Sequence, residues 1–330
     1  MSVSTPPGSP GPTGSSPAST AGAVPAAHPD STADRPAPFG RVCTAMVTPF
    51  NGHGEVDLDA AAAVATYLVD SGHDCVLVSG TTGESPTTTD EEKVRLLRAV
   101  LDAVGDRARV AAGTGSNDTR HSIELAEQAY QAGAHALLVV TPYYNKPTQA
   151  GVIAHMTAVA DAVDAAVVVY DIPGRTGLAL ERDTLLKLAA HPRITGVKDA
   201  SGDLFKVSEV MSRTGLAYYS GDDELNLAHL AQGAVGLVSV VGHVAGRQYR
   251  SMIQAVDAGD LATARQIHRQ LIPAVRALMR TSQGAIMAKA ALKELGVLDN
   301  CDMRLPLLPA TDDMLKSLRT GLAEAGLSRS

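Results

Sequence analysis

One lysine follows an apolar segment in a way that suggests chemistry. The chain contains eight lysines, and Lys198 is the one that directly continues a short apolar run, residues 194–197. Burial disfavours the ammonium form of a lysine and lowers its pKa, and the neutral amine can then attack a ketone carbonyl to form an imine. Position alone leaves a second interpretation equally open, in which Lys198 extends to solvent or pairs with Asp199.

Residues able to bind an anion or transfer a proton follow other apolar runs. Thr81 and Thr82 lie in a glycine-bounded turn, where backbone N–H groups and hydroxyls can bind a carboxylate. Tyr143 and Tyr144 are adjacent and could transfer protons, and Arg175 follows a Pro-Gly pair and could hold a carboxylate bidentately. Taken alone, each has a plainer interpretation as an ordinary turn, structural tyrosines or a surface arginine.

Motifs for dinucleotides and metals are weak. The Gly-Thr-Gly sequence at 113–115 lacks the third glycine of a dinucleotide fingerprint. The acidic run at 222–224 could suggest a metal site, but acidic residues are expected at the start of a helix because of its dipole. The ten histidines show no spacing typical of metal ligands. We therefore expect no cofactor and no metal site.

The elements that must position these residues alternate between strand and helix. Short runs rich in Val, Ile and Leu predict eight strands, at 42–47, 75–79, 110–113, 136–140, 166–170, 194–198, 217–220 and 236–240. Amphipathic stretches between them predict helices at 57–70, 90–104, 119–131, 148–162, 182–190 and 204–213. This order predicts an α/β fold, a (β/α)8 TIM barrel, with a doubly wound open sheet as the alternative. In a TIM barrel the active site forms where the strands end, which is where the candidate residues fall.

The two ends of the chain differ from the barrel. After the eighth predicted strand the pattern indicates helices at 261–279, 286–295 and 312–325. The first 38 residues are rich in Pro, Ser, Gly, Ala and Thr and have almost no large apolar side chains. We therefore predict a disordered tail over 1–38, a barrel catalytic domain over 39–260 and a C-terminal helical domain over 261–330.

Composition excludes several classes of partner. A net charge of -7, an aromatic content of 3% and the absence of Trp argue against nucleic acid. No apolar stretch reaches roughly 18 residues, so we expect no membrane association, and residues 1–33 do not resemble a secretory signal. The three cysteines are widely spaced and suggest no disulfide framework, which fits a cytoplasmic location.

Four segments taken together resemble the dihydrodipicolinate synthase family. They are residues 80–85, 141–145, 170–177 and 197–199, in the family's order and at fitting separations, and the resemblance runs from about residue 40 to the C-terminus. A chance match of four motifs is improbable. The wider superfamily, which includes N-acetylneuraminate lyase and keto-deoxy-sugar-acid aldolases, shares the 80–84 turn, the tyrosine on the fifth strand and the lysine on the sixth.

The resemblance implies four catalytic residues. Lys198 would form a Schiff base with pyruvate, and Tyr170 would move protons to and from the former carbonyl. Thr81 and Tyr144 would complete a proton relay with Tyr170, with Tyr144 supplied by a neighbouring subunit. A relay helps because tyrosine, with a reference pKa of roughly 10, is a poor base alone.

The resemblance also implies four residues that bind substrate. Thr82 would hold the pyruvate carboxylate, and Val238 on the eighth strand and Gly221 would line the same pocket. Arg175 would receive the carboxylate of L-aspartate-4-semialdehyde, and the sialate-cleaving relatives lack a Gly-Arg-Thr-Gly or Ser-Arg-Thr-Gly sequence there. The implied product is 4-hydroxy-tetrahydrodipicolinate, on the route to diaminopimelate and lysine, made without a cofactor by a lyase that forms a homotetramer of two tight dimers.

One departure from the family pattern concerns regulation. Lysine-inhibited members use a histidine and a glutamate on the helices after strands two and three, and the matching positions here carry Lys93 and His121. Ser85, Asn117 and Tyr143 agree with the pattern. A cation at Lys93 repels the ammonium groups of lysine, so we predict weak or absent feedback by lysine.

Two other functions remain open at this point. The first is a pyruvate-dependent aldolase or lyase that acts on a sugar acid, which Arg175 disfavours. The second is a catalytically inactive homologue that senses a ligand, which the intact set of Lys198, Tyr170, Thr81 and Tyr144 disfavours.

Overall fold

Eight parallel strands form a closed barrel in the computed structural model, which describes residues 1–4 and 37–328. The strands pair in sequence order, and β1 closes the barrel against β8. Their bounds are β1 Val42–Ala45, β2 Cys75–Val78, β3 Arg109–Gly113, β4 Ala136–Val140, β5 Ala166–Asp171, β6 Ile194–Asp199, β7 Ala217–Ser220 and β8 Gly236–Ser239. The predicted TIM barrel is confirmed, whereas most of the predicted disordered tail over 1–38 lies outside the described residues.

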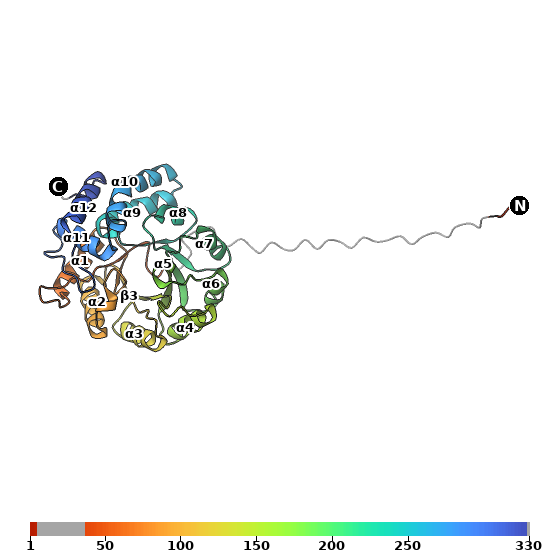
Figure 1. The fold of residues 1–330 in the computed structure, drawn as a ribbon, viewed down its shortest axis with the longest axis horizontal. Helices are drawn as coiled ribbons and strands as arrows, with labels where there is room; N and C mark the ends of the chain where they lie inside the picture. The colour runs from red at the N-terminus through yellow and green to blue at the C-terminus, as the bar shows by residue number, and fades with distance from the viewer. Residues whose placement is uncertain (5–36, 329–330) are drawn as a thin grey trace.

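A ring of helices surrounds the barrel, as Figure 1 shows in a view along the barrel. The helices between strands are α1 Leu58–Asp70, α2 Asp90–Val104, α3 Thr119–Gln131, α4 Gln149–Asp161, α6 Arg182–Leu188, α7 Leu204–Met211 and α8 Asn226–Ala231, with α9 Gly242–Asp257 after β8. Two short elements follow strands directly, the 3-10 helix η2 Ser85–Thr87 and the helix α5 Pro173–Thr176. The sequence pattern did not reveal α5, α8, α9 or η2.

Side-chain caps fix where several helices begin. In front of α2, the Thr89 hydroxyl accepts from the Glu92 N–H at 3.2 Å, and the Glu92 carboxylate accepts from the Thr89 N–H at 2.8 Å. This reciprocal capping box satisfies N–H groups that the first turn leaves without partners. Asp57 caps α1 and Asp118 caps α3 more simply, each through a side-chain carboxylate that accepts from one N–H of the first turn.

The strands are buried on both faces, as expected for a parallel barrel. The interior of the barrel contains a cluster of mostly small residues together with Tyr170 and Tyr219. The Tyr219 hydroxyl accepts a hydrogen bond from the Phe39 N–H at 3.1 Å, and the two rings are in contact. A larger apolar layer lies between the outer face of the strands and the helices. This packing leaves the ends of the strands as the place for polar side chains.

Three helices extend the barrel on the side that carries α9 (Figure 1): α10 Leu261–Met279, α11 Gly284–Glu294 and α12 Asp312–Glu324. The apolar layer between barrel and helices also contains Ala288 and Leu292 of α11, so this helix packs into the barrel's own core. The boundary that we propose between the two domains falls in the turn between α9 and α10.

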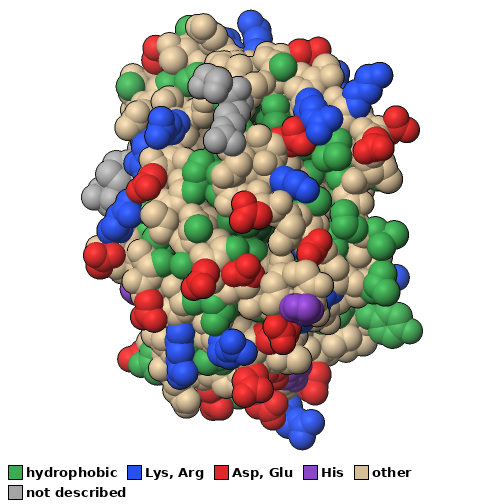
Figure 2. All heavy atoms as spheres, turned by 90° about the vertical axis from the view of Figure 1, so that its left-hand side faces the viewer, with side chains coloured by type: hydrophobic (Ala, Val, Ile, Leu, Met, Phe, Trp, Pro, Cys, Tyr) green, Lys and Arg blue, Asp and Glu red, His purple; other side chains and the backbone are tan. Residues whose placement is uncertain are grey.

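The outer surface carries charges of both signs. Figure 2 shows acidic and basic side chains interspersed with small apolar patches over the face that lies on the left of Figure 1. Within the described part of the chain, no helix is both long and apolar enough to cross a membrane.

Candidate active site

Lys198 lies inside the barrel at the carboxyl end of β6. Its side chain is 5% exposed, and its neighbours in register are Tyr170 on β5 and Tyr219 on β7. Its Nζ lies 4.2 Å from the centroid of the Tyr170 ring. Successive residues of a strand face opposite ways, and Asp199 accepts hydrogen bonds from Ser201 instead. The interpretation in which Lys198 extends to solvent or pairs with Asp199 is therefore wrong.

Burial makes the ammonium form of Lys198 lose its proton more easily than that of a lysine in water. The pKa of Lys198 is lowered to about 8, mainly by burial and to a smaller extent by the nearby Arg175 cation, while Cys43 and Asp223 act in the opposite direction. At pH 7 about a tenth of the amine is then neutral, compared with less than about a thousandth for a lysine in water. The neutral amine is the form that can attack a carbonyl carbon.

Tyr170, beside Lys198, carries a hydroxyl with a transferable proton. Its side chain is 6% exposed, and burial raises the pKa of its hydroxyl while Arg175 opposes that rise. Its carbonyl accepts from both the N–H and the hydroxyl of Thr141, each at 3.0 Å, which fixes the end of β5. Tyr170 therefore remains a phenol at neutral pH and can donate a proton to a group bound at Lys198.

Gly221 leaves room for the Lys198 side chain. A Cβ at Gly221 would lie 2.9 Å from Cγ and 3.0 Å from Cε of Lys198, and 3.1 Å from the Asp199 carbonyl. The backbone after β7 thus packs directly against the lysine stem. Any larger residue at this position would displace the amine.

The turn after β2 carries Thr81 and Thr82 between tightly packed backbone segments. Thr82 is buried and Thr81 half-buried. The Thr48 hydroxyl donates to the Gly83 carbonyl at 2.6 Å, and a Cβ at Gly83 would lie 3.0 Å from the Met46 carbonyl. Contacts from the end of β1 therefore hold this turn at the mouth of the barrel, where all eight strands end.

The β8 side of the site is braced by Asp223. Val238 on β8 is buried inside the barrel. Asp223 is 3% exposed and accepts from the N–H groups of Val240 and Val241 at 2.8 and 3.0 Å and from the Tyr249 hydroxyl at 3.0 Å. The carboxylate of Asp223 therefore fixes the segment after β8, a role that its interpretation as a residue complementing a helix dipole did not include.

Arg175 stands at the opening of the site. It lies on α5, which Figure 1 places near the middle of the ring of helices, and its side chain is exposed. Its charge acts on both Lys198 and Tyr170. Gly177 ends the helix with a φ of 72°, a left-handed conformation that glycine adopts without strain. The position suits recognition of an anionic group entering the barrel.

Within a single chain, the Tyr144 side chain does not lie next to the other candidate residues. Its side chain is 89% exposed, and its φ of 71° is rare for a residue that is not glycine. Such an exposed side chain cannot also contact the buried Tyr170 ring. The segment is tethered by Asn145, whose side-chain N–H donates to the Asn117 carbonyl at 2.8 Å.

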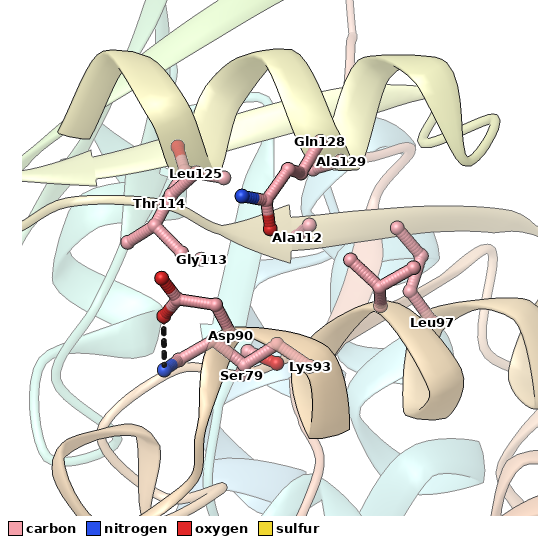
Figure 3. A pocket seen from close by; sticks show the side chains of 11 residues that line it. Ser79, Asp90, Lys93, Leu97, Ala112, Gly113, Thr114, Leu125, Gln128 and Ala129 are labelled. Carbon is pink, nitrogen blue, oxygen red and sulfur yellow. Dashed lines mark hydrogen bonds and ion pairs between the residues drawn. The ribbon is translucent and has the colours of Figure 1, made fainter. Parts of the chain in front are cut away.

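The side chains of Lys93 and His121 form hydrogen bonds with residues of the same chain. Lys93 donates to the Thr88 carbonyl at 2.7 Å and to Asp90 at 3.4 Å, and His121 Nε2 lies 2.9 Å from Asp90. Figure 3 shows Asp90 and Lys93 facing Thr114 and Gln128 across a small cavity. The cavity has a volume of about 20 Å³, enough for about one water molecule.

Two buried ion pairs near the site were missed from the sequence. Lys206 of α7 donates to Asp171 at 2.7 Å, and Lys289 of α11 donates to Glu84 at 2.6 Å. Asp171 directly follows Tyr170, and Glu84 closes the turn of Thr81 and Thr82. No local pattern links these residues, because each pair joins separate elements. Among the described residues, no group of three or more His, Cys, Asp or Glu could hold a metal ion.

Comparisons with known proteins agree over nearly the whole chain. The model of the Dihydrodipicolinate synthetase family matches residues 38–325. A "4-hydroxy-tetrahydrodipicolinate synthase" of Kineococcus radiotolerans is 60% identical over 91% of this chain and 98% of the relative. The "4-hydroxy-tetrahydrodipicolinate synthase 2" of Streptomyces coelicolor is 53% identical over 88% of this chain and 96% of the relative.

Solved structures agree as well. DHDPS from Cyanidioschyzon merolae, determined with lysine bound, is 42% identical with a TM-score of 0.85, over 88% of this chain and 99% of that one. The chloride-inhibited enzyme from Acinetobacter baumannii, complexed with pyruvate, is 35% identical with a TM-score of 0.84, again over 88% and 99%. Barrel and C-terminal helices are thus shared with these proteins.

Proposed function

The chain belongs to the dihydrodipicolinate synthetase family, and from this we infer its reaction and propose which side chains carry it out. The activity is that of a lyase, a 4-hydroxy-tetrahydrodipicolinate synthase in the diaminopimelate pathway to lysine. The family uses pyruvate and L-aspartate-4-semialdehyde. The observation that best supports this activity at a specific residue is the buried amine of Lys198, with its pKa of about 8, against the ring of Tyr170.

The first stage activates pyruvate. The neutral amine of Lys198 attacks the keto carbon, water leaves, and a protonated imine results. Thr82 binds the pyruvate carboxylate, and Tyr170 donates and recovers protons at the former carbonyl oxygen. The imine withdraws electrons, so a proton leaves the methyl group and an enamine forms. Because its pKa is raised, Tyr170 needs Thr81 and Tyr144 as a relay when it acts as a base.

The second stage joins the two substrates. The enamine carbon attacks the aldehyde carbon of the semialdehyde and forms a carbon–carbon bond, while the aldehyde oxygen takes up a proton and becomes the hydroxyl of the product. The amino group of the semialdehyde then attacks the imine carbon, closes the ring and displaces Lys198 as a free amine. Arg175 at the opening binds the carboxylate of the semialdehyde, while Gly221 and Val238 line the pocket around the lysine.

We further propose that the enzyme is a cytoplasmic homotetramer made of two tight dimers. The exposure of Tyr144 supports this assembly, because its side chain is available to complete the site of a neighbouring subunit. The free Cys43, Cys75 and Cys301 fit a reducing compartment.

Steady-state kinetics with Arg175→Gln tests the second substrate. The wild type should form the cyclic product from pyruvate and L-aspartate-4-semialdehyde but not accept a sugar-acid aldehyde. Loss of a charged hydrogen bond costs about 1.5–3 kcal/mol, so KM for the semialdehyde should rise roughly tenfold or more in the variant. Imine formation with pyruvate should be affected less than binding of the semialdehyde. It should still slow, because loss of the Arg175 charge raises the pKa of Lys198 and leaves less neutral amine. Turnover of the sugar-acid aldehyde alone would refute the proposal.

A further inference from the structure

A buried ion pair joins the C-terminal helices to the turn that carries Thr81 and Thr82. Lys289 of α11 is 1% exposed, and Glu84, at the end of this turn, is 2% exposed. The Lys289 Nζ donates to Glu84 Oε1 at 2.6 Å across 205 positions of sequence. The site therefore includes a contact from outside the barrel.

Both charged groups of the pair have further partners. The Lys289 Nζ donates to the Asp302 carbonyl at 2.6 Å and lies 4.1 Å from the centroid of the Phe50 ring. The second oxygen of Glu84 accepts from the backbone N–H of Arg304 at 3.1 Å. A buried charge is costly unless it is paired, so removal of the Lys289 ammonium would leave a buried carboxylate with one backbone donor.

The backbone at both ends of the turn is strained. Ser79 and Glu84 have φ values of 55° and 54°, in the left-handed region that non-glycine residues rarely adopt. Such a conformation costs about 1–3 kcal/mol and persists only where the surroundings enforce it. At Glu84 the enforcing contacts are those of its carboxylate.

Glu84 is coupled directly to the threonines. Its N–H donates to the Thr81 carbonyl at 3.2 Å, so rotation of the Glu84 backbone moves Thr81. On the other side, the Thr48 hydroxyl holds Gly83. The turn is thus fixed between the end of β1 and the C-terminal helices, and only the second anchor depends on a charge.

We propose that Lys289 is a positioning residue for pyruvate binding, which acts through Glu84 to fix the turn of Thr81 and Thr82. The inference rests on the proposed function for the roles of those two threonines. Lys289 itself is buried beneath the turn and contacts Glu84, Asp302 and Phe50. Its loss should therefore weaken pyruvate binding without removing any group that touches the substrate.

The test compares Lys289→Met with Lys293→Met, an exposed lysine one turn later on the same helix. Glu84→Gln and the double variant Glu84→Gln/Lys289→Met complete a cycle. Each protein is measured for KM and kcat with pyruvate, KM for the semialdehyde, and amide hydrogen exchange of residues 79–88. In the double variant residue 84 is a neutral amide and no unpaired carboxylate is buried. Its KM for pyruvate should therefore be lower than that of Lys289→Met.

The expected result is a KM for pyruvate raised roughly tenfold or more in Lys289→Met, as for about 1.4 kcal/mol of lost binding, with a smaller change in kcat. Exchange at 79–88 should accelerate, and Lys293→Met should behave as wild type. An unchanged KM for pyruvate would overturn the inference, whether or not exchange at 79–88 changes. If Lys289→Met does not fold, Glu84→Gln takes its place, with KM for pyruvate and exchange at 79–88 as the two measurements.

The two proposals fail in different ways. If the wild type forms no imine with pyruvate, the proposed function is wrong, and exchange at 79–88 still decides whether Lys289 fixes the turn. If the wild type forms the imine but Lys289→Met binds pyruvate normally, only the positioning role is wrong.

Discussion

The pKa of Lys198 is lowered mainly because the end of β6 removes its amine from water, with Arg175 as a smaller contributor. A neighbouring carboxylate would act in the opposite sense, as Asp223 does, because it stabilises the ammonium form. Tyr170 is affected by the same burial in the opposite sense, because burial disfavours its charged phenolate. The same apolar environment therefore favours a neutral amine at Lys198 and a protonated hydroxyl at Tyr170.

A pH dependence follows from the lowered pKa of Lys198. Below a pKa of about 8 the neutral fraction of the amine falls tenfold per pH unit, so imine formation should slow by that factor between pH 7 and pH 6. Above that pKa the rate should level off. Rapid quenching with borohydride at low pyruvate measures it, and a midpoint near that of an exposed lysine would contradict the burial argument.

The close approach at Gly221 predicts a sensitive position. Gly221→Ala places a Cβ against Cγ and Cε of Lys198 and should displace the amine, which we expect to lower kcat/KM for pyruvate roughly tenfold to a hundredfold. Gly215→Ala is the matched control, since a Cβ there meets nothing within 4 Å. Equal activity of the two variants would show that the contact at Gly221 is unimportant.

At the scale of elements, short apolar runs predicted every strand of the barrel, because the strands are largely buried on both faces and most of their residues are therefore apolar. The helices that it missed have physical reasons. Both α5 and α8 are too short for a period to appear. The first five residues of α9 include two glycines and a non-helical Ala245, with a φ of -127°, which hides its start.

The candidate site could be predicted only where residues follow strands. Lys198 and Thr82 could be singled out because they lie at or just after strand ends, whereas Val238, inside β8, was implied by the family resemblance alone. The partners Glu84 and Lys289 could not be paired from sequence, because the contact depends on how α11 packs against the barrel. The exposure of Tyr144 likewise appears only in the folded chain.

The contacts between α2 and α3 bear on regulation. Lys93 and His121 are both bound to Asp90, so a cation and an imidazole occupy the place where lysine-inhibited relatives have a histidine and a glutamate. We predict weak or absent inhibition by lysine, because Lys93 repels its ammonium groups. Initial rates measured over a lysine titration check this, and half-maximal inhibition at sub-millimolar lysine would contradict it.

At the scale of the whole molecule, the C-terminal helices contribute to the barrel's core as well as covering its side. Ala288 and Leu292 of α11 join the apolar layer, and Lys289 between them reaches the turn after β2. The domain that we propose over 261–330 therefore contacts the barrel core through apolar packing and the turn after β2 through an ion pair. A neighbouring subunit would complete the same site through Tyr144.

Subunit complementation tests that assembly. Co-expression of Tyr144→Phe with Lys198→Met chains, purified through two different tags, should restore activity that each variant lacks alone. A mixed dimer has one of its two sites with both residues intact, so mixed dimers alone should show about half of wild-type activity, and an unselected random mixture about a quarter. Sedimentation should show a tetramer. No recovery in the mixed dimers would mean that Tyr144 acts within its own chain.

The most direct test of the account is to trap the imine at Lys198. The protein is incubated with pyruvate and borohydride, digested, and mapped by peptide mass. The predicted result is one reduced pyruvate adduct, on the peptide that contains Lys198, and no adduct in Lys198→Met, with the buried Lys206 and Lys289 unmodified in both. An adduct on another lysine, or none in the wild type, would contradict the mechanism.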